Sequence, residues 1–276
     1  MSEMKNDFLQ INNLTVYYSN AKYKYILNNI NFKIKKGEFI CLCGPNGSGK
    51  STMISTIAKN YFSNLCIKKE SDFYFNDTKL TNIKHNKFAK IVSCLVQNEN
   101  TVWNYSVEDF ILSGRFVHSN GFANYSKEDK IMVDNILNEL SITELKGKTV
   151  HNLSGGEFQK IRIARTLIQD TPIVLLDEPA ASLDFAFRFE LLNILRNYAK
   201  KKNKIFLCSI HELNLATIFA DKIMLLGNGN FYFDKAEKII KPEILQQVYK
   251  INFGVFMHPE FNCLQVYPKF SLSREV

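Results

Sequence analysis

The sequence lacks any hydrophobic run long enough to span a membrane. A transmembrane helix needs about 20 predominantly apolar residues, whereas a short run such as IVLL at residues 173–176 ends at two carboxylates. A signal peptide is also missing, because the first ten residues, MSEMKNDFLQ, are polar and partly acidic where such a peptide would be basic and then apolar. We therefore expect a chain that neither crosses a membrane nor is exported.

The numbers of glycine, proline and cysteine residues exclude further classes of protein. The chain has 12 glycines and 6 prolines among 276 residues, too few for a fibrous or disordered protein. Its six cysteines contain no Cys-x-x-Cys pair, and four of them lie in apolar, strand-like runs: Cys41, Cys43, Cys94 and Cys208. We expect all six, including Cys66 and Cys263, to be buried, reduced thiols.

Arginine is scarce as well. The net charge is +8, but 29 of the 35 basic residues are Lys and only 6 are Arg. A lysine excess spread along a chain is typical of a solvated surface, whereas a nucleic-acid groove favours clustered Arg with interleaved aromatics. We expect no nucleic-acid partner; contact with anionic lipid or with a membrane protein fits the charge better.

The hydrophobic patterns predict an α/β fold. Short apolar runs between residues 8 and 43 predict a layer of antiparallel strands, and an apolar helix pattern begins at Lys50. From residue 171 onward, the strand-like runs PIVLLD, KIFLCSI and KIMLLG alternate with helix patterns at 185–199 and 212–220. Such alternation is typical of a mainly parallel sheet with flanking helices. The N-terminal strands would form an additional antiparallel β layer.

Residues 104–170 predict an inserted α-helical subdomain. Apolar residues recur there at helical spacing in two groups: Val107, Phe110 and Ile111, and then Ile131, Ile136, Leu137 and Leu140. Ser106 and Ser126 stand at the positions of helix N-caps.

A phosphate-binding loop is indicated by GPNGSGKST, which follows the strand-like run EFICLC and precedes a helix. Its glycines would let backbone N–H groups close around phosphates. Lys50 would reach the β- and γ-phosphates, and the Ser51 hydroxyl would be offered to Mg²⁺. The predicted nucleotide-binding residues are Gly44, Pro45, Asn46, Gly47, Ser48, Gly49, Lys50, Ser51 and Thr52.

Two adjacent carboxylates end the apolar strand IVLLDEP. We predict that Asp177 holds Mg²⁺ and that Glu178 polarises the attacking water near the γ-phosphate. On its own this pattern is common, but beside a phosphate-binding loop it indicates an ATPase with ATP and Mg²⁺ in its site.

LSGGE at residues 153–157 is a second glycine-bearing helix start, and therefore a second anion site, where one ATP needs only one such loop. With this motif the sequence resembles the nucleotide-binding subunits of ABC transporters. The resemblance implies that Ser154, Gly155, Gly156 and Glu157 complete the ATP site of a partner, in a head-to-tail homodimer with ATP sandwiched between the subunits.

The remaining motifs of the family can be placed by the resemblance. Tyr18 matches the aromatic that stacks on adenine, with Tyr17 the neighbouring alternative. Gln97 matches the glutamine that contacts Mg²⁺ and the attacking water and reports nucleotide state to the membrane subunit. The resemblance also implies that Leu183 and Asp184 lie in the loop that crosses the dimer interface, and that His211 contacts the γ-phosphate.

Two positions depart from the family pattern: Phe158 follows the signature, where a basic or polar residue is usual, and Ala180 replaces the usual Thr. Neither supplies a catalytic atom, so ATP hydrolysis is still expected. The resemblance implies one ABC-type ATPase domain over residues 1–276. Within it, 8–103 and 171–276 would form a RecA-like core with the β layer, and 104–170 the helical subdomain that carries the signature.

The segment SVEDFILSGR resembles the importer ATPases for iron siderophores, haem and vitamin B12. This branch implies a peripheral subunit on the cytoplasmic face of a bacterial membrane, which docks on a permease dimer served by an extracytoplasmic substrate-binding protein. The aromatics Trp103, Tyr105 and Phe116 do not fit the inner helix stripe, and we expect them to face the permease.

Other functions remain open at this point. The subunit could serve import of another small solute, such as a metal ion or an oxyanion, or it could be a soluble ABC ATPase that acts on nucleic acid or ribosomes. A regulatory module without catalysis would lack one of four residues that are all present: Lys50, Asp177, Glu178 and His211. LSGGE together with His211 argues against a P-loop kinase or GTPase.

Overall fold

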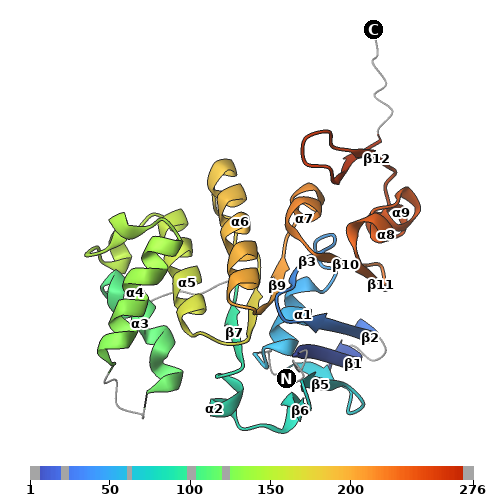
Figure 1. Cartoon of the computed structure of the whole chain (residues 1–276). Coiled ribbons are helices and arrows are strands. Elements are labelled where there is room, and N and C mark those ends of the chain that lie inside the picture. The colour runs from blue at the N-terminus through green and yellow to red at the C-terminus, as the bar shows by residue number, and fades with distance from the viewer. Residues whose placement is uncertain (1–6, 20–24, 61–63, 98–103, 120–124, 270–276) are drawn as a thin grey trace, which may run out of the picture.

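The computed structural model describes residues 7–19, 25–60, 64–97, 104–119 and 125–269. Its centre is a six-stranded sheet in the order β11-β10-β3-β9-β8-β7 (Figure 1). All neighbours are parallel except the edge strand β11, which is antiparallel to β10. The strands are β3 (Phe39–Cys43), β7 (Val92–Leu95), β8 (Ile173–Leu176), β9 (Ile205–Ser209), β10 (Lys222–Gly227) and β11 (Asn230–Asp234).

A second, antiparallel sheet lies beside it, in the order β2-β1-β5-β6 with β4 also paired to β1. Its strands are β1 (Phe8–Tyr18), β2 (Tyr25–Lys35), β4 (Leu65–Ile67), β5 (Asp72–Phe75) and β6 (Thr78–Lys79). These two sheets, with the helices around them, confirm the predicted α/β class.

One strand was assigned to the wrong layer. Residues 39–43 were predicted to belong to the antiparallel strands, but β3 pairs in parallel with β9 and β10. The burial pattern gives the physical reason. Every residue of β3 is buried, as a central parallel strand requires, whereas exposed and buried residues alternate along the second half of β2.

Side chains of the parallel sheet alternate between two hydrophobic cores. Ile40 and Leu42 pack with helix α1 (Lys50–Ile57) and the antiparallel sheet. Cys41 and Cys43 point to the other face, which is covered by α6 (Phe185–Lys201) and α7 (Leu213–Phe219). The prediction of buried thiols is confirmed for Cys41, Cys43 and Cys208, whereas Cys66, Cys94 and Cys263 are partly exposed.

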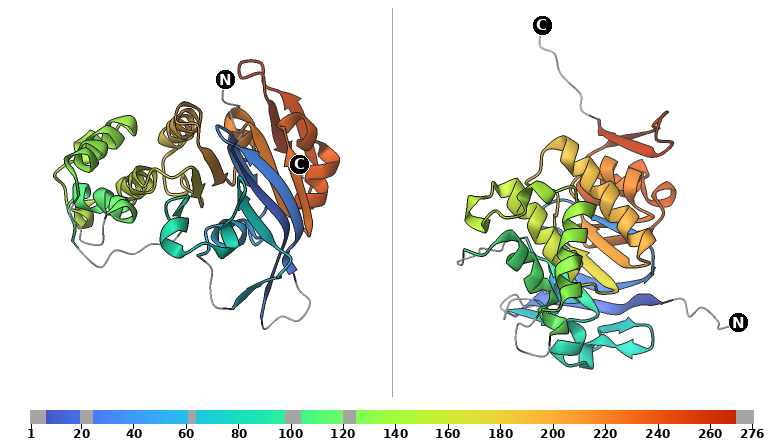
Figure 2. Two further views of the ribbon diagram at one scale, coloured as in Figure 1. Left: turned by 60° about the horizontal axis from the view of Figure 1, so that its bottom comes forward. Right: turned by 60° about the vertical axis from the view of Figure 1, so that its left-hand side comes forward.

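The helices of the region 104–170 lie to one side of the sheets in Figure 1 and in the left-hand view of Figure 2. They are α3 (Val107–Leu112), α4 (Lys127–Glu139) and α5 (Gly155–Ile168). The predicted caps are confirmed, because Ser106 accepts a hydrogen bond from the Asp109 N–H and Ser126 forms a capping box with Asp129.

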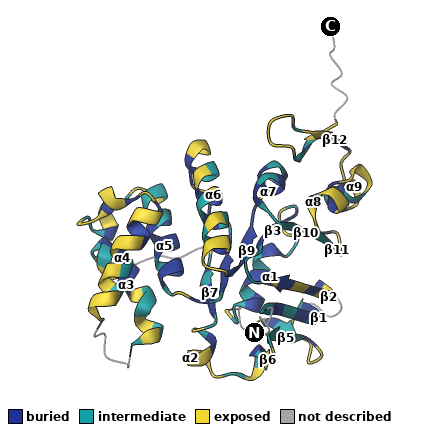
Figure 3. Cartoon of the chain, in the orientation of Figure 1, coloured by how far each residue is buried: buried dark blue, intermediate teal, exposed yellow. Residues whose placement is uncertain are grey.

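Helix α4 buries a different stripe from the one predicted at its start. Ile136, Leu137 and Leu140 are buried as expected, but the side chain of Ile131 is 58% exposed and Val133 is buried in its place. Two residues correspond to about 200° of helical rotation, so Ile131 lies on the outer face, where exposed residues dominate (Figure 3).

Short helices and a hairpin complete the chain. They are α2 (His85–Phe88), α8 (Ala236–Ile239), α9 (Pro242–Tyr249), the 3₁₀ turns η1 (Leu80–Asn82), η2 (Ser113–His118), η3 (Thr143–Leu145) and η4 (Val150–Asn152), and the strands β12 (Phe253–Met257) and β13 (Leu264–Pro268). No helix in the described part of the chain combines the length and the apolarity that crossing a membrane requires.

Candidate active site

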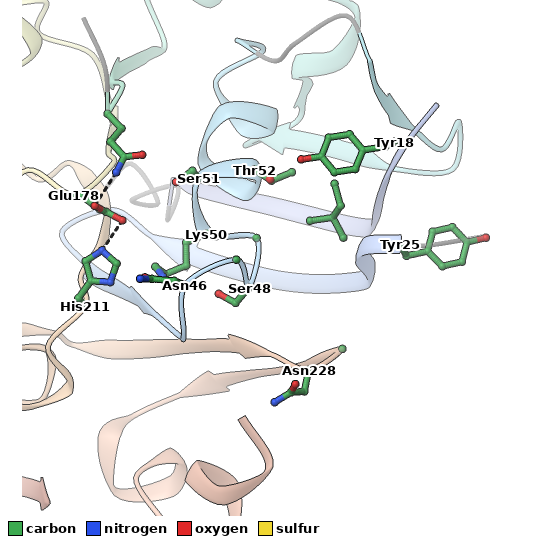
Figure 4. Close-up of a pocket in the computed structure, with 15 residues that line it drawn as sticks. Tyr18, Tyr25, Asn46, Ser48, Lys50, Ser51, Thr52, Glu178, His211 and Asn228 are labelled. Atoms are coloured by element: carbon green, nitrogen blue, oxygen red, sulfur yellow. Dashed lines mark hydrogen bonds and ion pairs between the residues drawn. The ribbon is translucent and has the colours of Figure 1, made fainter. Parts of the chain in front are cut away.

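A pocket of about 760 Å³ lies where the loop after β3 enters α1 (Figure 4). Its walls come from the phosphate-loop motif, from the ends of β7, β8 and β9, and from the antiparallel sheet. The residues that line it are Tyr18, Tyr25, Ile26, Asn46, Gly47, Ser48, Gly49, Lys50, Ser51, Thr52, Gln97, Glu178, His211, Asn228 and Gly229.

The loop needs glycine at two points where a side chain could not fit. A Cβ on Gly44 would approach the Leu226 carbonyl oxygen to 2.0 Å. Gly49 caps helix α1 in the left-handed conformation, with a φ of 102°. The first N–H groups of α1 therefore face the pocket, as a phosphate site at a helix N-terminus requires.

Lys50 is only 5% exposed, and its ammonium group is held by the loop itself. Nζ donates to the carbonyl oxygens of Gly44 at 2.9 Å and Pro45 at 3.1 Å. Burial lowers the pKa of Lys50, and the nearby Glu178 carboxylate works in the opposite direction. A triphosphate in the pocket would favour the charged ammonium.

Asp177 ends strand β8 and is also 5% exposed. Its Oδ1 accepts a hydrogen bond of 2.7 Å from the Ser209 hydroxyl. Burial raises the pKa of the Asp177 carboxyl, while hydrogen bonds from Ser209 and Ser51 lower it. The Asp177 carboxylate and the Ser51 hydroxyl supply hard oxygen donors, so these residues fit Mg²⁺.

Glu178 is held between two of the other predicted catalytic residues. Oε1 lies 2.6 Å from His211 Nε2, and Oε2 accepts a hydrogen bond of 3.0 Å from Gln97 Nε2 (Figure 4). Glu178 adopts a left-handed backbone with a φ of 50°, and its N–H donates to Ser209 Oγ at 2.7 Å. Residues from the ends of three parallel strands thus meet at one edge of the sheet.

Some predicted site residues do not line this pocket: Gly44, Pro45, Asp177, Asp184 and the signature residues Ser154, Gly155, Gly156 and Glu157. Ser154 and Glu157 form a capping box at the start of α5, and Lys148 pairs with Glu157 at 2.8 Å. That pair and the Ser154 hydrogen bonds lower the pKa of Glu157 to about 2. Asp184 caps α6 by accepting the Phe187 N–H at 2.8 Å. A Cβ on Gly155 would meet nothing within 4 Å, so the glycine surface of the signature is open.

Several pocket residues were missed by sequence reasoning: Tyr25, Ile26, Asn228, Gly229 and, behind the carboxylates, Ser209. Tyr18 lines the pocket and Tyr17 does not, since Tyr17 packs edge-on against Tyr25 at 6.1 Å. The strand register pairs Tyr17 with Tyr25. If the strands that contain Tyr17 and Tyr25 had been paired as a hairpin, the sequence would have indicated Tyr25 as a pocket residue.

Comparison with known proteins identifies the family. Residues 27–181 match the family model described as ABC transporter, so the chain belongs to that family. It is 31% identical over 240 residues to the iron(3+)-hydroxamate import ATP-binding protein FhuC of Bacillus subtilis, covering 87% of each chain.

Two solved structures support this assignment. An inward-facing metal-chelate type ABC transporter superposes with a TM-score of 0.80 at 26% identity, covering 96% of this chain and 98% of the other. The dimeric post-hydrolysis cassette MJ0796 with ADP and Pi superposes with a TM-score of 0.70 at 26% identity, covering 82% and 98%. The protein is an ATP-binding, ATP-hydrolysing ABC subunit.

Proposed function

We propose that this subunit powers the import of an iron chelate. The observation that carries the proposal is the pocket in which Lys50 faces a Glu178 held by Gln97 and His211. The transported class is supported by the likeness to the hydroxamate-import subunit over 87% of both chains, and by the likeness to the metal-chelate type transporter. Haem and cobalamin are chelates of the same broad kind.

Each catalytic residue has a role that its position supports. Lys50 and the α1 N–H groups neutralise the β- and γ-phosphates, and Tyr18, at 40% exposure, offers its ring to the adenine. Glu178 orients water and accepts its proton as the bond to the γ-phosphate breaks. His211 and Gln97 hold the Glu178 carboxylate and can turn toward the γ-phosphate and the attacking water.

Mg²⁺ bound by Ser51 and Asp177, with Gln97 nearby, would neutralise charge that develops on the phosphates. Asp177 is fixed for this by Ser209, whose hydroxyl also accepts the Glu178 N–H. One serine therefore holds the Asp177 carboxylate and the backbone from which Glu178 extends.

Dimerisation would complete the site. The open surface at Gly155 begins a helix whose first turn is already capped by Ser154 and Glu157. Such an N-terminus suits the γ-phosphate of an ATP held by a second copy of this chain, with Asp184 beside the interface. The dimeric MJ0796 cassette supports this arrangement.

Besides a second copy of this chain, the partner would be a permease dimer in the membrane, which receives its substrate from an extracytoplasmic substrate-binding protein. Tyr105 and Phe116 are 46% and 55% exposed at the two ends of the α3 and η2 segment, which fits a docking surface. Trp103, predicted to belong to the same surface, lies outside the described residues. This role places the subunit on the cytoplasmic face of the membrane.

Uptake by the source cells tests the proposal. Cells that lack this chain are complemented with the wild type or with Glu178→Gln and supplied with ⁵⁵Fe-labelled ferric hydroxamate. The wild type should restore uptake, and the variant should stay lower by at least about tenfold, as loss of a proton acceptor predicts. Restored uptake of labelled cobalamin or an oxyanion, with none of the iron chelate, would refute the proposed substrate class.

A further inference from the structure

Arg162 is a charged side chain buried in the middle of α5, with only 4% of its surface exposed. Its Nη2 donates to the carbonyl oxygen of Val96 at 2.5 Å, and Val96 directly precedes Gln97. Its Nη1 donates to Oε1 of Gln159 at 2.6 Å. A guanidinium on the signature helix therefore holds the backbone from which Gln97 extends.

Gln159 makes a similar hydrogen bond to the backbone that follows the neighbouring strand, β8. It is 7% exposed, and its Nε2 donates to the carbonyl oxygen of Pro179 at 3.0 Å, one residue after Glu178. Residues 159 and 162 are three apart and share one face of α5. Through these two side chains, α5 is hydrogen-bonded to the backbone carbonyls of Val96, next to Gln97, and of Pro179, next to Glu178.

Phe158 connects the same guanidinium to α3. The Arg162 Cζ lies 5.9 Å from the centre of the Phe158 ring, which packs against Phe110 with ring centroids 5.7 Å apart. This contact gives a physical role to an aromatic that departs from the family pattern. Phe110 is itself buried and belongs to the helix that follows the exposed Tyr105.

Stability alone does not account for Arg162. Taking a guanidinium out of water is costly, and well-packed apolar residues in place of buried charges are often neutral or stabilising. What an apolar side chain cannot supply is a pair of fixed donors aimed at the Val96 carbonyl and at Gln159.

We propose that Arg162 is a positioning residue that couples α3, through Phe110 and Phe158, to Gln97. A shift of α3 on docking moves the Phe158 ring and the guanidinium, and the bond to the Val96 carbonyl carries that shift to Gln97. Gln159 holds the register between α5 and the end of β8. The inference rests on the proposed catalytic role of Gln97 and extends it to a route from the helical region.

Steady-state ATPase kinetics of the full chain test the coupling. Arg162→Met keeps the length and removes both donors; it should lower kcat by at least about tenfold and leave KM for ATP within about threefold. Arg162→Lys, which keeps one donor, should recover part of the loss. Arg196→Met on α6 is the matched control and should change neither constant. Arg162→Met leaves the Val96 carbonyl and Gln159 Oε1 without these donors, so its melting temperature should fall. The kinetics are therefore compared at a temperature at which the wild type and the variant are both folded.

A double-mutant cycle with Gln97→Ala distinguishes an error in the proposed coupling from an error in the proposed role of Gln97. If Arg162 acts through Gln97, the double variant should be no slower than Gln97→Ala alone, because effects along one route are not additive. Multiplied losses, or wild-type kcat in Arg162→Met, would overturn the coupling. If Gln97→Ala itself hydrolyses ATP normally, the proposed role of Gln97 fails first. Should Arg162→Met unfold, Arg162→Lys takes its place in the cycle, with a smaller expected loss of kcat, the same expected non-additivity and the same refutation.

Discussion

Lys50 lines the pocket and Asp177 directly precedes the lining residue Glu178; the two carry opposite charges, and each is 5% exposed. Burial penalises both charged forms, lowering the pKa of Lys50 and raising that of Asp177. The two residues are therefore ready to gain from ligands of opposite charge, the triphosphate for Lys50 and Mg²⁺ for Asp177. Each residue keeps a charge that its function needs and that lowers the stability of the fold. Removing the charge should therefore change the melting temperature, which can be measured.

Asp177→Asn should raise the melting temperature while lowering ATP turnover by at least about tenfold. A carboxyl whose pKa is raised in the folded state destabilises the fold as pH rises above its usual value of 3.8, because the native protein then holds a buried charge. The gain should be about 2–4 °C near pH 7.5, equivalent to about 1 kcal/mol in a chain of this size, and should shrink toward pH 4. Scanning calorimetry at the two pH values measures it, and a gain equal at both would contradict the account.

At the scale of elements, one glycine sets how the helical region packs. Gly114 lies in η2, and a Cβ there would come within 2.3 Å of the Arg165 backbone oxygen and 2.8 Å of Ile168 Cγ2 on α5. The next residue, Arg115, bonds to Asp129 of α4 at 2.7 Å and to the Ile168 carbonyl at 3.2 Å. The Gly-Arg pair therefore fixes η2 against two helices at once.

Gly114→Ala should destabilise the fold by about 1–3 kcal/mol, because the added Cβ would meet the Arg165 backbone oxygen, which cannot rotate away. Urea unfolding measures the change. Gly155→Ala, where a Cβ would meet open space, is the control for stability and should lose less than about 0.5 kcal/mol. Equal stability of the two variants would show that the η2 contact with α5 is looser than the structure indicates.

Local sequence patterns predicted most helices and strands. The main error concerned which strands pair with one another. Ser106 and Ser126 mark helix starts through contacts with residues three positions away, so the sequence alone could show them. Strand β3 was misplaced because its partners β9 and β10 lie more than 160 residues along the chain. The phosphate-loop motif, Glu178 and His211 were found from motifs. Ser209 and Tyr25 were missed, since their roles depend on which strands adjoin.

For the whole molecule, we propose that the core binds ATP and that the helical side meets the membrane partner. The exposed Tyr105 directly precedes the cap of α3, away from the pocket. Tyr105→Ala should leave the ATPase rate of the isolated subunit within about threefold and lower iron-chelate uptake at least about tenfold, a loss of about 1.4 kcal/mol at the interface. The same prediction holds for Trp103→Ala. Normal uptake would place the docking surface elsewhere, and equal loss of both activities would assign Tyr105 to the fold.

We propose that Glu178 drives ATP hydrolysis within a sandwich of two subunits. Glu178→Gln keeps the shape of the side chain but cannot accept a proton, so ATP should stay bound and hold the dimer closed. Light scattering during gel filtration with Mg-ATP measures this directly. The account predicts a species of about twice the 31.9 kDa chain mass, absent without ATP and unable to release phosphate. A monomer at saturating ATP, or phosphate release at the wild-type rate, would contradict it.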